Sequence, residues 1–213
     1  ITLPNSIRAD APKNLERRFE MFKHMAEAGF EKLGISAEHG DQDFLDKTIG
    51  KRLDLQEIVN SIDICHKAGI MVHTNFMMGF PFETKANRDK TINFAKSLKS
   101  DSFSVSLVAP LPGTKLFDIV KKNNLFMPNF NVSRIVYDVV SIIPHDITPE
   151  NLLKLVKKLN KELNTMALNN NPQLKEYYNL IKGKNIKDRK YSFSDKKKLI
   201  VQSQAHGSIV PNN

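Results

Sequence analysis

The sequence predicts an α/β fold: one half of a partial (β/α) TIM-like barrel with parallel strands, followed by a mostly helical C-terminal extension. Two observations predict it. β-prone segments centred near residues 33, 72 and 104 alternate with segments whose apolar residues have helical spacing. Each β-prone segment also ends in a polar, Gly- or Pro-rich stretch, and right-handed crossovers place such loops on one edge of a parallel sheet.

Length and composition fit one domain with a tail. The chain has 213 residues, of which 40% are hydrophobic. It contains no apolar run of about eighteen residues that would predict a membrane span, and no leader that would predict secretion. Cys65 is its one cysteine, which excludes an intrachain disulfide and a cysteine metal cage. We therefore expect a cytoplasmic protein, and because Ile1 lies in what reads as mid-strand, a fragment whose N-terminal part is missing.

The net charge of +9 is concentrated near the C-terminus. Residues 1–150 hold 19 basic and 19 acidic side chains, whereas residues 151–213 hold 13 and 4. This excess fits either an arm for nucleic acid or a solvated lysine-rich extension. Only one of the 13 basic residues is Arg, the residue preferred for phosphate recognition, so the solvated extension is favoured.

The first expected helix opens at Pro12 and stops at Gly29, with apolar residues at helical spacing. A strand over 31–37 follows, because Leu33 and Ile35 alternate with polar or small residues. A short helix then runs to Gly50.

The second full helix is expected after Asp54, with Glu57 completing a capping box. Residues 70–84 come next and form the central stretch of the chain. They predict a strand to Gly79, a sharp break, and a helix capped by Thr84.

A strand over 103–109 alternates apolar residues with serines, and Thr114 caps the helix after it. The connection 123–144 reads as irregular, with a strand around 135–143. A long helix starts at Thr148-Pro149.

We expect three regions: the barrel part over 1–125, a mostly helical region over 126–182 that includes a short helix near 174–181, and a basic, poorly ordered tail over 183–213.

Several strand-end residues can carry chemistry. Glu38 can accept hydrogen bonds from a ligand amine or hydroxyl, and it can equally be a loop carboxylate. Gly40 is expected to supply a positive φ or a close approach to a ligand. Arg8 can grip a carboxylate, or pair with Asp10 or Glu38.

Other titratable residues are less specific. Cys65 lies on the apolar face of a helix and is expected to be a buried small hydrophobe. His73 and Asn75 give the central strand a partly polar face, which fits either a ligand-lined interior or ordered water.

Five motifs in order resemble the second half of radical S-adenosylmethionine (SAM) enzymes, most closely the class with an N-terminal cobalamin-binding domain. The resemblance covers about residues 1–125. Each motif alone is weak, and their order at successive strand ends is fairly specific. The motifs are Arg8-Ala9-Asp10, Leu33 to Gln42 (LGISAEHGDQ), Ile49-Gly50-Lys51, Gly79 to Thr84 (GFPFET) and Pro110 to Thr114 (PLPGT).

The resemblance implies a six-stranded partial barrel in which three cysteines bind a four-iron, four-sulfur cluster and SAM completes its coordination. It implies a 5′-deoxyadenosyl radical that abstracts hydrogen from a small-molecule substrate, and a reductant such as flavodoxin or ferredoxin. In the cobalamin-carrying class the outcome is often methyl transfer or ring rearrangement, and methylthiolation also stays open.

The resemblance also implies roles for individual residues. Arg8 would approach the methionine carboxylate or the ribose of SAM, and Glu38 and Gly40 match a turn that lies beside SAM. The remaining implied site residues line the adenine side (Asn75, Met77, Gly79), shape the next loop (Pro81) or close the rim over substrate (Pro110 to Thr114).

The chain departs from the family at three points. His39 stands where the family has Ser, and Phe82 stands where it has Gly. The cluster-binding cysteines are absent, so this chain alone is not expected to cleave SAM.

Two alternatives stay open. One is a different (β/α)-barrel enzyme that uses Glu38 and His39 as an acid–base pair, and the other is a binding module whose basic tail contacts nucleic acid.

Overall fold

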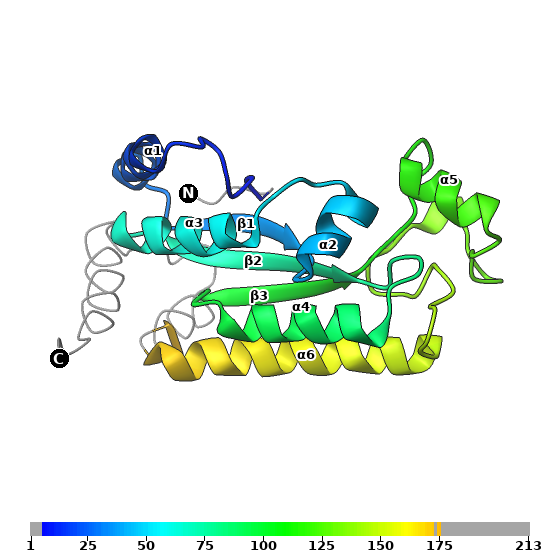
Figure 1. Cartoon of the computed structure of the whole chain (residues 1–213). Coiled ribbons are helices and arrows are strands. Elements are labelled where there is room, and N and C mark those ends of the chain that lie inside the picture. The colour runs from blue at the N-terminus through cyan, green and yellow to red at the C-terminus, as the bar shows by residue number, and fades with distance from the viewer. Residues whose placement is uncertain (1–5, 173, 176–213) are drawn as a thin grey trace.

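The computed structural model describes residues 6–172, 174 and 175. Its centre is an open sheet of three parallel strands in the order β1-β2-β3, namely β1 (Lys32–Glu38), β2 (Met71–Met78) and β3 (Ser102–Leu107). Parallel pairing, with helices between the strands, confirms the predicted half of a (β/α) barrel (Figure 1). The predictions for residues 1–3, for a helix near 174–181 and for the tail fall largely or wholly outside the described residues.

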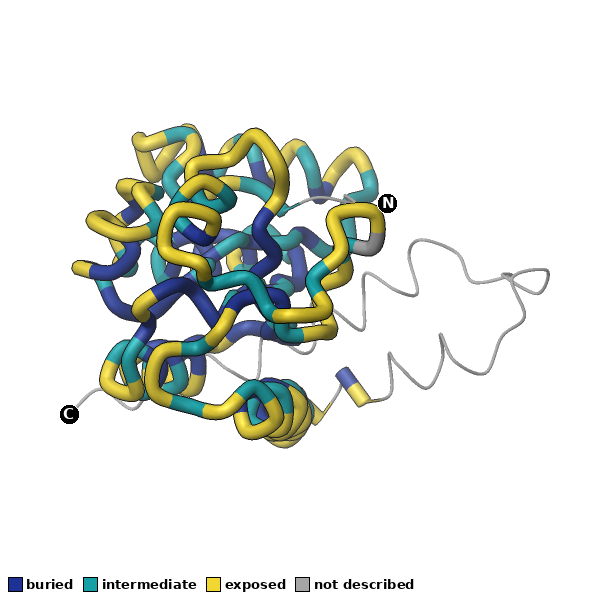
Figure 2. Tube along the Cα trace, turned by 90° about the vertical axis from the view of Figure 1, so that its right-hand side faces the viewer, coloured by how far each residue is buried: buried dark blue, intermediate teal, exposed yellow. Residues whose placement is uncertain are grey.

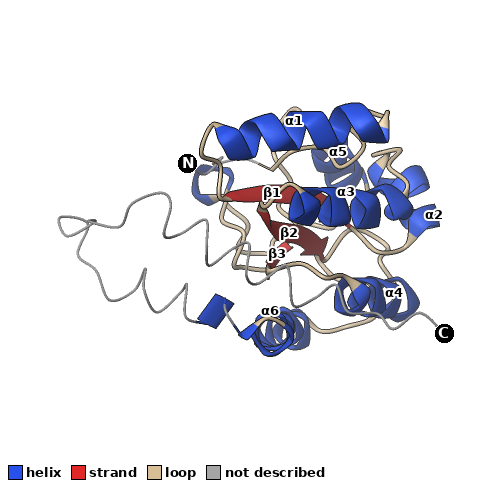
Figure 3. Ribbon diagram, turned by 90° about the vertical axis from the view of Figure 1, so that its left-hand side faces the viewer, coloured by secondary structure: helices blue, strands red, loops and turns tan. Residues whose placement is uncertain are grey.

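Helices α3, α4 and α6 cover one face of this sheet (Figures 1 and 3). The helices of the described chain are α1 (Leu15–Glu27), α2 (Gln42–Phe44) continuing into the π-helical turn η1 (Leu45–Ile49), α3 (Leu55–Lys67), α4 (Lys85–Ser97), α5 (Lys115–Lys122), the 3₁₀ turn η2 (Val132–Arg134) and α6 (Pro149–Asn170). None of them is both long and apolar enough to cross a membrane.

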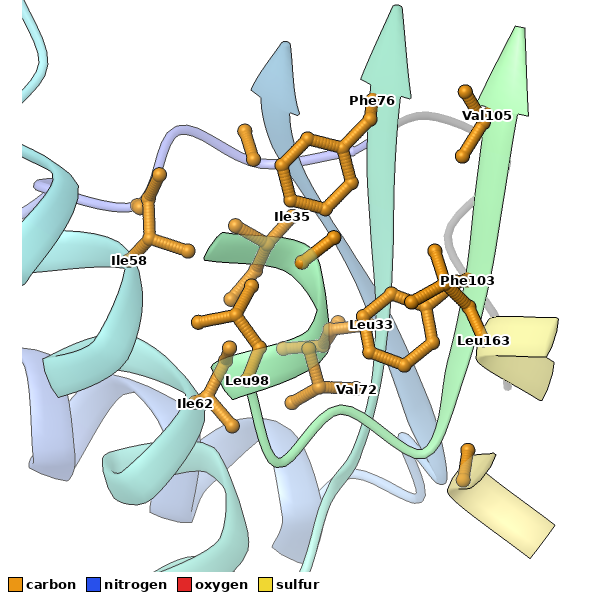
Figure 4. Close-up of a cluster of buried hydrophobic side chains, with 14 of the residues drawn as sticks. Leu33, Ile35, Ile58, Ile62, Val72, Phe76, Leu98, Phe103, Val105 and Leu163 are labelled. Carbon is orange, nitrogen blue, oxygen red and sulfur yellow. The ribbon is translucent and has the colours of Figure 1, made fainter. Parts of the chain in front are cut away.

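The core forms because every second residue of each strand faces the helices and, apart from the hydrogen-bonded Thr74 of β2, these residues are apolar. Leu33, Phe76 and Val105 are among the side chains that the strands bury against the helices (Figure 4). The same cluster includes Leu152 to Ala167 of α6, so this helix packs on β3 as part of the sheet's core. Figure 2 shows the buried segments in the middle of the molecule, below exposed loops and helix surfaces.

The predicted helix ends are mostly confirmed. Thr84, Thr114 and Thr148 each accept a hydrogen bond from a backbone N–H of the first turn of the helix they cap. Gly29 and Gly50 follow their helices with positive φ, as a C-terminal stop requires.

Three expectations were wrong. The first helix begins at Leu15 rather than at Pro12, because the Asn14 side chain accepts a hydrogen bond from the Arg17 N–H and caps the helix there. Asp54 caps α3 without the expected capping box, since the Glu57 carboxylate pairs with the buried Arg18 at 2.7 Å. No strand spans 135–143 in the described chain; the connection makes only an isolated bridge between Phe126 and Ile142.

The outer edge of β3 is closed by side-chain amides. Asn160 of α6 accepts from the Val105 N–H at 2.8 Å and donates to the Val105 carbonyl at 2.8 Å. One helical turn on, Asn164 does the same for Phe103, at 3.0 and 2.9 Å. An open sheet would leave the backbone groups of β3 exposed at its edge, but here the two asparagines take the place of a neighbouring strand.

The face of the sheet opposite the helices is polar. Its middle row runs from Ser36 through Asn75 to Ser104, which are partners in the register. The Asn75 amide donates to the Ser6 hydroxyl and accepts from the Ser104 hydroxyl, so it links β3 to the segment that precedes α1. Both polar groups of the Asn75 amide are thus satisfied by hydrogen bonds within the protein.

His73 lies on the same face and contacts the Ser102 hydroxyl at 2.7 Å through Nδ1. Burial, together with the positive charge of Lys32, lowers the pKa of His73 to about 4. The imidazole is therefore neutral at pH 7.

We expect Asn160→Ala to lower the free energy of unfolding by about 1–3 kcal/mol, because both Val105 backbone groups lose their partner. Urea unfolding measures the loss. Lys161→Ala, at an exposed position of the same helix, is the matched control. A loss in Asn160→Ala no larger than in this control would contradict the role of the amide.

We also expect stability to fall as the pH drops from about 6.5 towards 4. Over this window the unfolded state takes up a proton on His73 that the folded state does not, so protonation favours unfolding. Urea unfolding at several pH values should show a shallower pH dependence in His73→Gln. His24→Gln, at an exposed histidine, should leave the slope unchanged.

Candidate functional site

The loops that follow the three strands lie at one edge of the sheet. All arrows point the same way in Figure 1, and α2, the loop after β2 and α5 lie at the end to which they point. Four of the predicted site residues, Gly40, Gly79, Pro81 and Pro110, lie in these loops, and Glu38 ends β1 beside them. The carboxyl edge of a parallel sheet is where (β/α) folds place their active sites.

Glu38 ends β1 at this edge, in an uncommon backbone conformation. Its φ is 65°, and the register of β1 against β2 shifts between Ser36 and Glu38. The carboxylate accepts a hydrogen bond from Lys51 Nζ at 2.9 Å, and the same ammonium donates to the Ser36 carbonyl at 2.6 Å. Since non-glycine residues at positive φ concentrate at functional sites, this geometry supports the prediction that Glu38 is a site residue.

Lys51 belongs to the Ile49-Gly50-Lys51 motif, but the sequence did not predict it as a site residue. Its side chain reaches back from the segment after η1, thirteen positions from Glu38. No local sequence pattern pairs these two residues. The result is a carboxylate and an ammonium side by side at the end of β1, both partly buried.

Arg8 is held by internal contacts. Its guanidinium pairs with Asp10 at 2.5 Å and donates to the carbonyls of Lys51 and Arg52 at 3.0 and 2.7 Å. Although burial works to raise it, the hydrogen bond and charge of Arg8 hold the pKa of Asp10 below its usual range. The structure thus shows the ion pair with Asp10 that the sequence left as an alternative.

Gly40 is required for packing. Its φ is not positive, which corrects the expectation of a left-handed residue here. A Cβ on Gly40 would lie 2.6 Å from Thr91 Cα and 2.8 Å from Phe94 Cβ, and its N–H donates to the Thr91 hydroxyl at 3.0 Å. The close approach is therefore to helix α4.

Asn75 and Met77 lie on the polar face of β2. Asn75 is in mid-strand with its amide hydrogen-bonded on both sides. Met77 is nearer the strand end and packs against the small apolar cluster of Phe44, Phe80 and Val108. Of the two, Met77 is closer to the edge where the loops meet.

Gly79, Pro81 and Phe82 make the turn after β2. Gly79 has a φ of 89°, and Pro81 is buried. Phe82, which stands where the resemblance has Gly, adopts a φ of 64° with its ring half exposed. The backbone thus keeps the conformation that favours glycine, at a cost of about 1 kcal/mol or more.

Pro110 is buried at the start of the rim segment after β3, whereas residues 111–114 are exposed. Thr114 folds back so that its hydroxyl donates to the Leu111 carbonyl at 2.6 Å. The segment is positioned at the same edge as the other loops (Figure 1).

The structure does not join Glu38 and His39 as an acid–base pair. His39 is fully buried, and its ring nitrogens contact Glu83 and the Asp41 N–H. Glu38 pairs with Lys51 instead. The sequence neighbours diverge because the positive φ of Glu38 turns the chain between them.

Sequence reasoning also missed a pocket of about 570 Å³ beside β3, a size common for ligand sites. It lies between β3, the segment 135–138 and α6. Its lining includes Ser106, Tyr137, Asp138 and Lys157 among apolar side chains. The walls come from three segments that are about 20 to 50 residues apart in the sequence, so no single sequence motif predicts the pocket.

An iron–sulfur cluster does not fit the residues present. Cys65, the one cysteine of the chain, is buried on α3, and burial raises the pKa of its thiol. In the described part of the chain, no three His, Cys, Asp or Glu residues are grouped so that they could hold a metal ion.

Three relatives illustrate what this chain is similar to. It is 32% identical to an uncharacterised methyltransferase of Pyrococcus horikoshii over 110 residues, which are 52% of this chain and 24% of the relative. It is 24% identical to the tRNA-2-methylthio-N(6)-dimethylallyladenosine synthase of Thermosipho melanesiensis over 173 residues, 78% of this chain and 36% of that protein. It is 25% identical to the heme chaperone HemW of Bacillus subtilis over 122 residues, which are 57% of this chain and 32% of that protein.

The chain therefore spans about a quarter to a third of the length of these relatives. The family described as the radical SAM superfamily matches residues 4–95, which include β1, β2 and the loops after both. The three parallel strands joined by helices are consistent with one half of the six-stranded partial barrel that the resemblance implied. The segment that carries the ends of β1 and β2 is therefore similar to the radical SAM superfamily.

Proposed function

We propose that the whole protein containing this chain is a radical SAM enzyme, and that this chain supplies the wall of its barrel that holds the amino-acid end of SAM. The observation that carries the proposal is the Glu38–Lys51 pair at the end of β1. The amino-acid end of SAM presents an ammonium and a carboxylate. A carboxylate and an ammonium 2.9 Å apart at a strand end are complementary to both.

The other site residues take supporting roles in this proposal. Met77 and Gly79 flank the adenine side, Pro81 shapes the following turn, and Pro110 places the rim. Arg8 holds the carbonyls of Lys51 and Arg52 and so fixes the segment that carries Lys51. Asn75 supports the site through its hydrogen bonds to Ser6 and Ser104 on the polar face of the sheet.

The four-iron, four-sulfur cluster is assigned to residues outside this chain. One buried cysteine cannot ligate it. We propose that cysteines elsewhere in the whole protein hold the cluster, and that a flavodoxin or ferredoxin reduces it. A cobalamin-binding domain is a further proposal from the sequence resemblance, with no support from the relatives' names.

The names of the relatives indicate the class of reaction that we propose, but not the substrate. Two relatives are named as methyltransferases, in Pyrococcus horikoshii and Synechocystis, and one as a tRNA methylthio-adenosine synthase. Methyl or methylthio transfer to a substrate is the reaction we propose. A small molecule is the favoured substrate, because the basic excess of residues 151–213 is almost all lysine.

We expect the purified 213-residue chain, reconstituted with iron and sulfide, to show no absorbance band near roughly 400 nm, where iron–thiolate clusters absorb. The reason is the lack of cysteine ligands. Iron and sulfide analysis should agree. A stoichiometric cluster on this chain would overturn the assignment of the cluster to other residues.

We expect Glu38→Ala in the whole protein to weaken SAM binding about 10- to 100-fold, the usual loss for a hydrogen bond to a charged group. Equilibrium dialysis with labelled SAM measures it. Asp43→Ala, which removes an exposed carboxylate near the same edge, is the matched control. Equal affinity in Glu38→Ala and wild type would remove Glu38 from the site.

A further inference from the structure

We propose that His39 and Glu83 form a positioning pair that fixes the loop after β1 against the loop after β2. Its effect on SAM rests on the proposed function. The pair joins residues 44 positions apart, and both side chains are almost completely buried, at 0% and 1% exposure. Neither residue reaches the surface of the site, so each acts through the loop that carries it.

Both ring nitrogens of His39 are used. Nδ1 accepts a hydrogen bond from the Asp41 N–H at 3.1 Å. A backbone N–H can only donate, so Nδ1 carries the lone pair and the proton lies on Nε2. Nε2–H then donates to the Glu83 carboxylate at 3.1 Å. One imidazole therefore closes the turn within its own loop and also reaches the next loop.

Glu83 uses its second oxygen on its own loop. Its Oε2 accepts from the Gly79 N–H at 2.7 Å, so the carboxylate spans the turn Gly79 to Glu83. The Glu83 carbonyl accepts from Arg88, whose guanidinium also pairs with Asp146. Both loops are thus closed internally by the same two side chains that join them.

Aromatic rings surround the pair. The Phe44 ring stacks on His39 with centroids 4.5 Å apart, and Phe80 meets it edge-on at 6.2 Å. Excluding water from these hydrogen bonds strengthens them and makes loss of either partner costly. Apolar residues of the same volume would stabilise a fold without burying a carboxylate, so the pair is better explained by the geometry it fixes.

The His39–Glu83 pair fixes the geometry of the candidate site. Glu38 and Gly40 are the immediate neighbours of His39, and Gly79 and Pro81 precede Glu83 on the turn that its carboxylate closes. A change in the link between the loops therefore moves the Glu38 carboxylate relative to the turn after β2. We infer that the pair sets the separation between the two walls that contact SAM.

Two substitutions of one residue separate the two hydrogen bonds of the ring. His39→Gln keeps a donor near the position of Nε2, towards Glu83. His39→Asn keeps an acceptor near the position of Nδ1, towards the Asp41 N–H, and loses the link to Glu83. In the whole protein, we expect His39→Asn to raise the KM for SAM about tenfold, and His39→Gln to raise it less than about threefold.

The readout is release of 5′-deoxyadenosine at varied SAM concentrations. A positioning role predicts a larger KM with kcat changed less than about threefold at saturating SAM. Glu83→Leu, which leaves no acceptor for the His39 ring or the Gly79 N–H, should raise the KM at least as much as His39→Asn does. The double variant should be no weaker than Glu83→Leu alone, because both substitutions break the same link between the loops.

The outcomes are distinguishable. If the wild-type protein neither binds nor cleaves SAM, the proposed function fails. If it does and His39→Asn lowers the melting temperature without changing the KM, the pair is only structural and the inference is overturned. If the variant does not fold, hydrogen exchange of backbone amides in the wild-type protein tests the inference. The N–H groups of Gly79 and Asp41 should exchange more slowly when SAM is bound. Exchange of these two groups at the rate of an unstructured peptide would overturn the inference.

Discussion

The candidate site depends on the parallel register of β1, β2 and β3. Parallel pairing directs all three strand ends to one edge, where the residues after Glu38, Met78 and Leu107 meet. Antiparallel pairing of the same segments would send every second loop to the opposite edge. The helices between the strands stabilise this register, because their apolar faces cover the one face of the sheet that is apolar.

The open sheet is completed by groups other than strands. On the outer side of β3, Asn160 and Asn164 bind the free backbone groups, and the Tyr137 carbonyl accepts from the Leu107 N–H. On the outer side of β1, Ile7 exchanges backbone hydrogen bonds with Gly34 and Ser36. Both edges are therefore occupied within the described chain, which protects them from pairing with other molecules.

The loops at the site combine backbone strain with buried polar contacts. Glu38 and Phe82 have positive φ values, and each is close in sequence to one member of the His39–Glu83 pair. Strained residues persist when the surroundings hold them in place. The buried pair, the aromatic rings and the close contact of Gly40 with α4 provide such surroundings. Together they give the edge a fixed shape.

Local sequence determined the elements of this fold and which loops carry the site. Apolar alternation in Leu33 and Ile35, caps such as Thr84, and stops such as Gly29 act between near neighbours, so they can be read directly. Only the tertiary structure decided which residues contact one another: Lys51 with Glu38, His39 with Glu83, Arg18 with Glu57, and α4 with Gly40. These partners are separated by 13 to 51 residues, and their contact depends on the packing of helices on the sheet, which no local pattern encodes.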